Sequence, residues 1–180
     1  MTKRDKLIIQ YLKHFRVMAR DQIAQLACPE VARPVVTVNR ILKRLSRDGY
    51  VLPIPQVKDR PYLYMPNPAI IHHRSNKIEH FLGLVDIYLR LKKPKIFEVE
   101  PQINDEYVPD AYTRINDRPV IIEYQRTLIS TKKMQSKVDA FVESYVRKQH
   151  DARTLLIVSD HNYPKITIPS GFHIIHKKTS

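Results

Sequence analysis

The sequence has little cysteine, little glycine and no long apolar run. Cys28 is its single cysteine, which excludes an intrachain disulfide and a cluster of cysteine metal ligands. With 3 glycines in 180 residues there is no glycine-rich phosphate loop, which argues against a nucleotide-hydrolysing motor or a dehydrogenase. No apolar run reaches the roughly 18 residues that cross a bilayer, and the first residues lack the apolar core of a secretory signal. We therefore expect a cytoplasmic protein with no membrane partner.

Acidic residues are also scarce, and their shortage is uneven along the chain. There are 31 Lys and Arg against 18 Asp and Glu, a formal net charge of +13. Residues 1–78 hold 15 of the basic side chains and 5 of the acidic ones. A compact N-terminal part with that excess carries a strong positive field, and a polyphosphate is the partner that it favours. An anionic membrane surface and an ordinary charged surface are the alternatives.

The N-terminal part of the sequence has the residue patterns of helices. Apolar residues recur at helical spacing over residues 4–15, which predicts a first helix. A short second helix is expected to begin at Asp21, whose carboxylate suits an N-cap. It should end at Cys28, because the residue before Pro29 avoids helical backbone.

A third helix is predicted from Pro34 to Asp48, and its two sides differ in chemistry. Proline suits the first turn of a helix, and Gly49 supplies a left-handed stop after the last one. One sector is apolar and the opposite sector is basic. The apolar sector holds Val38, Ile41, Leu42 and Leu45, and the basic sector holds Arg40, Lys43, Arg44 and Arg47.

Two β-rich runs, 50–57 and 62–65, flank a polar turn and predict a hairpin whose proline-containing first strand lies at a sheet edge. Three helices and a basic-tipped hairpin predict a winged helix-turn-helix over residues 1–66. The segment Asn39–Val51 resembles the recognition helix of winged-helix DNA-binding proteins. The resemblance implies that the third helix enters the major groove of double-stranded DNA while the hairpin contacts phosphates. The candidate base contacts are Arg33, Val36, Thr37 and Arg40, and the candidate phosphate contacts are Lys43, Arg44, Arg47, Lys58 and Arg60.

Residues 67–75, which are rich in proline and polar side chains, predict a linker to a second domain at 76–180. In that domain a helix precedes three strands, and a long helix precedes two more. A hairpin followed by a helical crossover favours a mixed sheet covered by helices, so the expected fold class is α+β. The predicted helices are 76–91 and 131–150, and the predicted strands are 95–99, 106–115, 118–125, 154–158 and 173–176.

Two carboxylates of this domain are expected at the same end of the sheet. Asp110 lies in the second predicted strand, and Glu123 comes near the end of the third. Paired carboxylates are typical ligands of a hard cation such as Mg²⁺ or Mn²⁺, which would polarise a phosphodiester and activate water. The alternative is that both are ordinary residues at strand ends.

Asp110, followed by Glu123 and Gln125 on the next strand, resembles the motif of PD-(D/E)xK nucleases. The order α-β-β-β-α-β also fits their restriction-endonuclease-like fold. The resemblance implies that Asp110 and Glu123 bind metal and that Glu79 assists from the preceding helix. Lysine is usual where Gln125 stands, and glutamine brings no positive charge. Some members of the superfamily tolerate glutamine, which can orient water by hydrogen bonds, and others move the lysine to the next helix. The candidates for such a lysine are Lys132, Lys133 and Lys137, and the remaining alternative is that the domain is degenerate.

Three short motifs extend the resemblance over nearly the whole chain: Glu79-His80, Pro109-Asp110-Ala111 and the run at 123–127. Together with the N-terminal winged helix they resemble the replication-relaxation family of bacterial plasmids, phages and other mobile elements. The family implies DNA binding in plasmid replication, DNA relaxation or transcriptional control, and its C-terminal half often lacks the full nuclease triad. A homodimer would suit paired half-sites. An active Mg²⁺-dependent DNA endonuclease and a winged-helix adaptor that binds proteins are the alternative functions.

Overall fold

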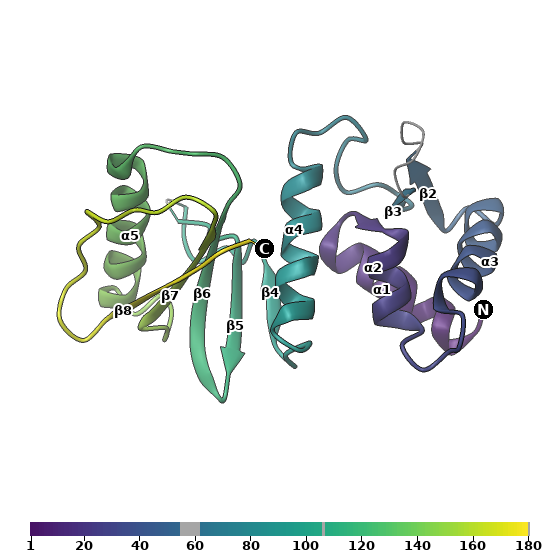
Figure 1. Cartoon of the computed structure of the whole chain (residues 1–180), viewed down its shortest axis with the longest axis horizontal. Helices are drawn as coiled ribbons and strands as arrows, with labels where there is room; N and C mark the ends of the chain where they lie inside the picture. The colour runs from purple at the N-terminus through teal and green to yellow at the C-terminus, as the bar shows by residue number, and fades with distance from the viewer. Residues whose placement is uncertain (55–61, 106, 180) are drawn as a thin grey trace. The chain divides into compact units, whose positions relative to one another are not determined.

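The computed structural model describes residues 1–54, 62–105 and 107–179. Over these residues the fold is mixed α and β, with five helices and two sheets (Figure 1). The packing divides the chain into two compact units, Met1–Ile87 and Tyr88–Ser180. The linker predicted at 67–75 thus lies inside the first unit. No helix in the described ranges is both long enough and apolar enough to span a bilayer.

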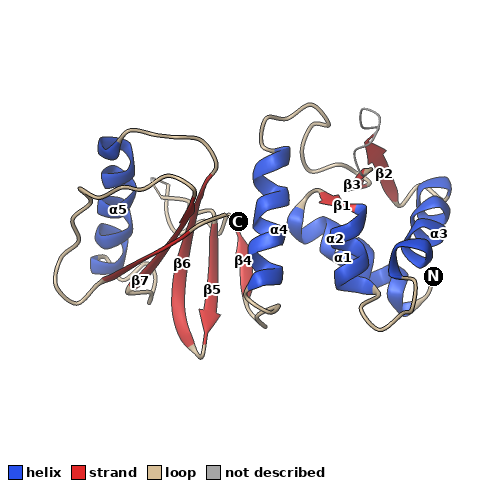
Figure 2. Ribbon diagram, in the orientation of Figure 1, coloured by secondary structure: helices blue, strands red, loops and turns tan. Residues whose placement is uncertain are grey.

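The first unit consists of three helices, a small sheet and most of a fourth helix (Figure 2). Its antiparallel sheet has the order β1-β3-β2, so the proline-containing β2 is an edge strand as predicted. The two-residue strand β1 was not predicted, because so short a run has no periodicity. The elements are α1 (Lys3–Phe15), β1 (Met18–Ala19), α2 (Arg20–Ala27), α3 (Pro34–Arg47), β2 (Val51–Ile54), β3 (Leu63–Pro66) and α4 (Ile78–Arg90).

The start of α2 differs from the prediction. Asp21 is not the N-cap but lies in the first turn, where it pairs with Arg20. The helix follows directly on β1, and its N-cap is Ala19. The amide oxygen of Gln22 accepts a hydrogen bond of 3.0 Å from the backbone N–H of Ala19, whereas the side chain of Ala19 cannot cap the N–H groups of the first turn.

The core of the first unit lies where the first three helices meet. Most residues in the apolar stripes of these helices are buried, as the helical periodicity predicted, whereas Ile41 of α3 is half-buried. Gln22 also ties α2 to α4, because its amide donates to the Leu82 carbonyl at 2.9 Å and to the Asp86 carboxylate at 2.7 Å. The stripe residues with less than 5 % exposure are Ile8, Leu12 and Phe15 of α1, Ile23 and Leu26 of α2, and Val38, Leu42 and Leu45 of α3.

The second unit is built on a five-stranded sheet of order β4-β5-β6-β7-β8. The first three strands run antiparallel, whereas β7 and β8 run parallel to β6. The hairpin between β5 and β6 turns at Asn116 and Asp117. Both residues have positive φ, as the two central residues of a type I′ turn require. The elements are β4 (Phe97–Val99), β5 (Ala111–Ile115), β6 (Arg118–Gln125), α5 (Thr131–Val146), β7 (Thr154–Ser159) and β8 (His173–Lys177).

Two bounds in this unit differ from the prediction. The strand expected at 106–115 begins only at Ala111, so Asp110 precedes β5 instead of lying within it, and residue 106 is outside the described residues. The helix expected to reach 150 ends at Val146, and Lys148 takes a positive φ soon after it. The helix α5 covers one face of the sheet (Figure 1). Met134, Val138 and Phe141 of α5 share a buried cluster with Ile121, Leu155 and Ile157 of the strands.

Candidate functional site

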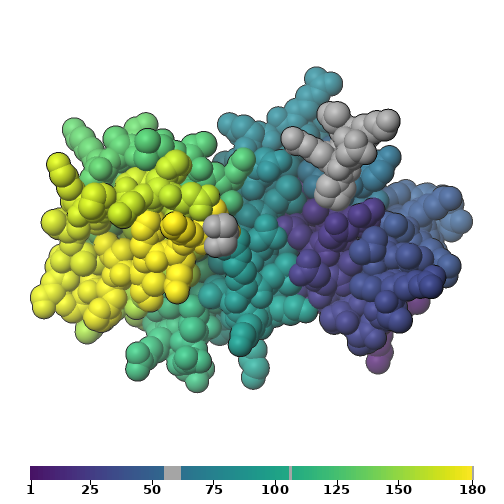
Figure 3. All heavy atoms as spheres, viewed as in Figure 1, coloured from purple at the N-terminus to yellow at the C-terminus, as the bar shows by residue number. Residues whose placement is uncertain are grey.

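The helix α3 has one buried face and one solvent-exposed face. Val38, Leu42 and Leu45 anchor it in the core of the first unit, each with no more than 1 % exposure. Pro34 opens the helix and Gly49, with φ of +77°, follows its end, both as predicted. The segment around α3 forms part of the visible surface of this unit in Figure 3. The helix is therefore held by its apolar side, and its basic side is available to a partner.

Most of the predicted DNA contacts are found on that exposed side. Arg40 and Lys43 are exposed and form no ion pair within the described residues. Among the residues that the structure describes, Arg47 forms an ion pair with its neighbour Asp48 alone, and both are exposed, so another anion can readily replace Asp48. Thr37 and Arg44 are half-buried. The other exposed candidates are Arg33 and Val36, whereas Lys58 and Arg60 lie outside the described residues.

Arg44 has a partner inside the protein. Its guanidinium donates to the carboxylate of Asp5 at 2.6 Å, and the Asp5 side chain is completely buried. Burial favours a raised pKa for Asp5, but hydrogen bonds from Thr2 and the charge of Arg44 outweigh it, and the pKa is lowered. Asp5 also caps α1 by accepting the Thr2 N–H at 2.6 Å. The pair thus fastens the first turn of α1 to α3.

The second unit brings together the two predicted carboxylates. Ala111 of β5 pairs with Ile122 of β6, so Asp110 and Glu123 occupy the next opposed positions of the antiparallel hairpin. An Asp110 carboxylate oxygen accepts the backbone N–H of Tyr124 at 2.7 Å. The charge of Asp110 acts on the pKa values of Glu123 and Lys137, so all three residues belong to one electrostatic cluster.

Glu123 is the buried centre of this cluster. It is 1 % exposed, and each of its carboxylate oxygens has a partner. The Tyr107 hydroxyl donates to Oε1 at 3.3 Å, and the Lys137 ammonium, from the second turn of α5, donates to Oε2. Burial and the charge of Asp110 raise the pKa of Glu123 to about 7, although Lys137 opposes that shift. Burial lowers the pKa of Lys137, but the two carboxyl groups that it faces raise the pKa by more. The net pKa is therefore raised, and Lys137 stays cationic.

The other two predicted catalytic residues do not bond to Glu123. Gln125 lies two residues beyond Glu123 on the same face of β6, and its side-chain amide donates to the Thr127 carbonyl at 3.0 Å. It therefore stabilises the backbone after the strand. Glu79 is an exposed residue of α4 and belongs to the first unit. A catalytic role for either residue stays a prediction.

The cluster does not fit a divalent cation as it is arranged. Two carboxylates are suitable ligands in kind, since Mg²⁺ prefers oxygen. Both oxygens of Glu123, however, already accept from Tyr107 and Lys137, and almost no surface of the side chain is accessible. Among the residues that the structure describes, no group of three or more His, Cys, Asp and Glu could hold a metal ion. The ammonium of Lys137 supplies the positive charge that a metal would bring.

Sequence reasoning missed the tyrosines of this cluster. Tyr107 is buried and donates to Glu123, but nothing in the sequence marks it as more than a core aromatic residue. The hydroxyl of Tyr163 is buried without a hydrogen-bond partner among the described residues, and Tyr163 makes a minor contribution to the raised pKa of Lys137. Tyr163 follows β7 by four residues, so only the sheet order brings it near α5.

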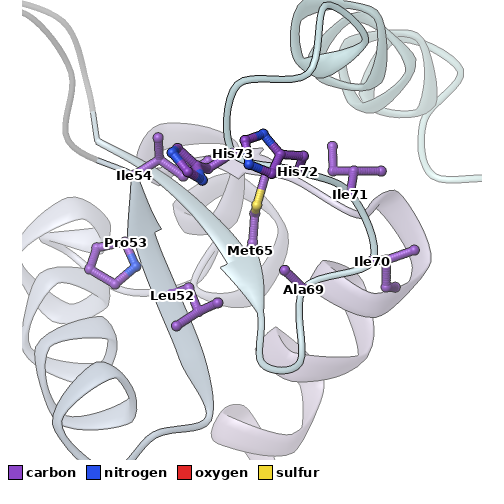
Figure 4. Close-up of a pocket in the computed structure, with 9 residues that line it drawn as sticks. All are labelled: Leu52, Pro53, Ile54, Met65, Ala69, Ile70, Ile71, His72 and His73. Atoms are coloured by element: carbon purple, nitrogen blue, oxygen red, sulfur yellow. The ribbon is translucent and has the colours of Figure 1, made fainter.

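The first unit also contains an apolar hollow of about 530 Å³ beside the β2–β3 hairpin (Figure 4). His72 and His73 stand together at one end of it, with ring centroids 4.3 Å apart. Its remaining lining is almost wholly aliphatic, so the hollow offers mainly apolar contact area. The other lining residues are Leu52, Pro53, Ile54, Met65, Ala69, Ile70 and Ile71.

No protein-family model matches the chain, and a search of curated proteins gives no match. The resemblance to the replication-relaxation family therefore stays a prediction that rests on the quoted motifs.

Proposed function

We propose that this protein binds double-stranded DNA by placing α3 in the major groove. The observation that carries the proposal is the pair of exposed side chains Arg40 and Lys43, which form no ion pair within the described residues. They project from a helix whose opposite face is locked into the core. A single α-helix fits the major groove, and cations on its exposed side approach both bases and phosphates.

The element order of the first unit supports this proposal. Helix, short strand, two helices and a hairpin in one antiparallel sheet is the order of a winged helix-turn-helix. The basic excess of residues 1–78 adds a long-range attraction to the duplex. The resemblance to the replication-relaxation family favours a role in replication, DNA relaxation or transcriptional control of a mobile element. We propose no nuclease chemistry for the second unit, because Glu123 is already occupied.

The double substitution Arg40→Ala and Lys43→Ala tests the proposal. The matched control is Lys165→Ala with Lys177→Ala, which removes the same charge from exposed positions of the second unit. Binding to a mixed-sequence duplex is measured by fluorescence anisotropy over a series of salt concentrations. We expect the α3 variant to bind roughly tenfold more weakly per substituted side chain. The slope of log K against log salt should fall by about 0.9 for each phosphate that the variant no longer neutralises.

The control should retain most of the affinity and most of the salt slope. Equal binding by the two variants and the unaltered protein would show that α3 does not contact DNA. Failure of the unaltered protein to bind a duplex at low salt would instead support the protein-binding adaptor.

A further inference from the structure

An open groove of about 480 Å³ lies between the first turn of α1 and the exposed side of α3. Guanidinium groups from two different helices line it, together with two threonine hydroxyls. We propose that this groove binds one backbone phosphate of the duplex, an assignment that rests on the proposed function and adds α1 to the interface. The lining residues are Thr2, Arg4, Asp5, Thr37, Arg40, Ile41 and Arg44.

The position of the groove on α3 is what a backbone phosphate requires. Thr37, Arg40 and Arg44 are spaced three and four residues apart, so they form one stripe along the margin of α3 that adjoins α1. A helix in the major groove has a sugar-phosphate strand on each side. One of these strands would run along that stripe and over the first turn of α1.

The charges in the groove favour an anion. Asp5 lies at its buried side and is already paired with Arg44, and Arg4 pairs with Glu30 at the surface. Arg40 has no acidic partner among the described residues. Each guanidinium carries five N–H donors, so one ion pair leaves donors for a phosphate.

Arg4 is also held in place before any ligand arrives. Its Nε donates to the Ala27 carbonyl at 3.1 Å, and Nη2 donates to Glu30. Ala27 and Glu30 line a neighbouring hollow and not this groove, so Nη1 is the donor that would have to reach a phosphate here. A side chain fixed in this way loses little entropy on binding. Glu30 is 62 % exposed, so solvent weakens its pair with Arg4, but its negative charge still opposes a phosphate bound beside it.

The test compares Arg4→Gln with Lys13→Gln, which makes the same charge change at the other end of α1. A second comparison sets Glu30→Gln against Glu143→Gln, which removes an equivalent exposed carboxylate paired with Arg147 in the second unit. Each variant is titrated against a mixed-sequence duplex over a salt series, after its thermal unfolding has shown that it is folded. We expect Arg4→Gln to bind roughly tenfold more weakly, with a salt slope lower by about 0.9, while Lys13→Gln changes little. Glu30→Gln should bind more tightly than Glu143→Gln, because it removes a negative charge beside the phosphate while the amide can still accept from Arg4.

Two results separate this inference from the proposed function. If Arg40→Ala weakens binding while Arg4→Gln equals Lys13→Gln and Glu30→Gln equals Glu143→Gln, the phosphate groove is wrong and the α3 interface stands. If none of these substitutions changes DNA affinity, both the groove and the α3 interface are overturned. Should Arg4→Gln fail to fold, the comparison of the two glutamate variants decides the inference by itself.

Discussion

At the scale of single residues, Lys137 occupies a carboxylate oxygen of Glu123 that a metal ion would need. It reaches Glu123 from α5 and leaves that carboxylate no free oxygen, because Tyr107 holds the other one. The Asp110–Glu123–Lys137 arrangement has the residue types of a metal-dependent nuclease, but here the lysine acts as the internal counter-charge. The two charges of the Glu123–Lys137 pair therefore compensate each other inside the fold, and removing one of them alone is costly.

We predict that Lys137→Met lowers the free energy of unfolding by about 3 kcal/mol, because it leaves a buried carboxyl group without its cation. The double variant Lys137→Met with Glu123→Gln should lose less than the sum of the single variants, since the partner charge is removed as well. Urea unfolding of the four proteins measures both effects. Mg²⁺ should leave the unfolding midpoint of the unaltered protein unchanged. A Mg²⁺-dependent stabilisation that Asp110→Asn abolishes would contradict this account.

At the scale of secondary-structure elements, the Asp5–Arg44 pair fastens α1 to α3. We predict that Asp5→Asn destabilises the first unit by about 2 kcal/mol near neutral pH, a value reduced because Arg44 is partly exposed. The pKa of Asp5 is lowered in the folded protein, so its contribution is present above about pH 4 and is lost as the pH falls through the folded value. Urea unfolding at several pH values should show the two proteins converging in acid. A difference that persists in strong acid would contradict the ion-pair explanation.

Elements with strong local signals could be predicted, and those that depend on distant pairing could not. The helix α3 has a buried apolar stripe, Pro34 and Gly49, and its predicted bounds differ from the structure by one residue at its end. The strand β6 has the predicted bounds because an apolar run is delimited by a turn. The strand β1 depends on its pairing with β3, and the late start of β5 depends on its pairing with β4 and β6.

The candidate sites follow the same division. Periodicity along α3 predicted the exposure of Arg40, Lys43 and Arg47, but it did not predict that Arg44 is half-buried against Asp5. The burial of Glu123 and its bond to Tyr107 could not be predicted, because they depend on how α5 and the loop before β5 close over β6. The position of Arg4 beside α3 could not be predicted either, because it depends on how α1 packs against α3.

At the scale of the whole molecule, the chain forms two compact units, and the candidate DNA-binding residues and the carboxylate cluster lie in different units. The basic excess belongs to residues 1–78, and the carboxylate cluster belongs to the second unit. This division predicts that DNA affinity follows the first unit and that the stability of the carboxylate cluster is independent of DNA.

Site-directed DNA cleavage tests the central claim most directly. The single native thiol, Cys28, is buried, so a cysteine introduced in place of Val36 can be labelled selectively with an iron chelate. Val36 is 45 % exposed on the outer side of α3, and Lys13 is an exposed control position on α1. The account predicts that a chelate at position 36 cuts a bound duplex, whereas a chelate at position 13 leaves it largely intact. Cutting from position 13 with none from position 36 would contradict it.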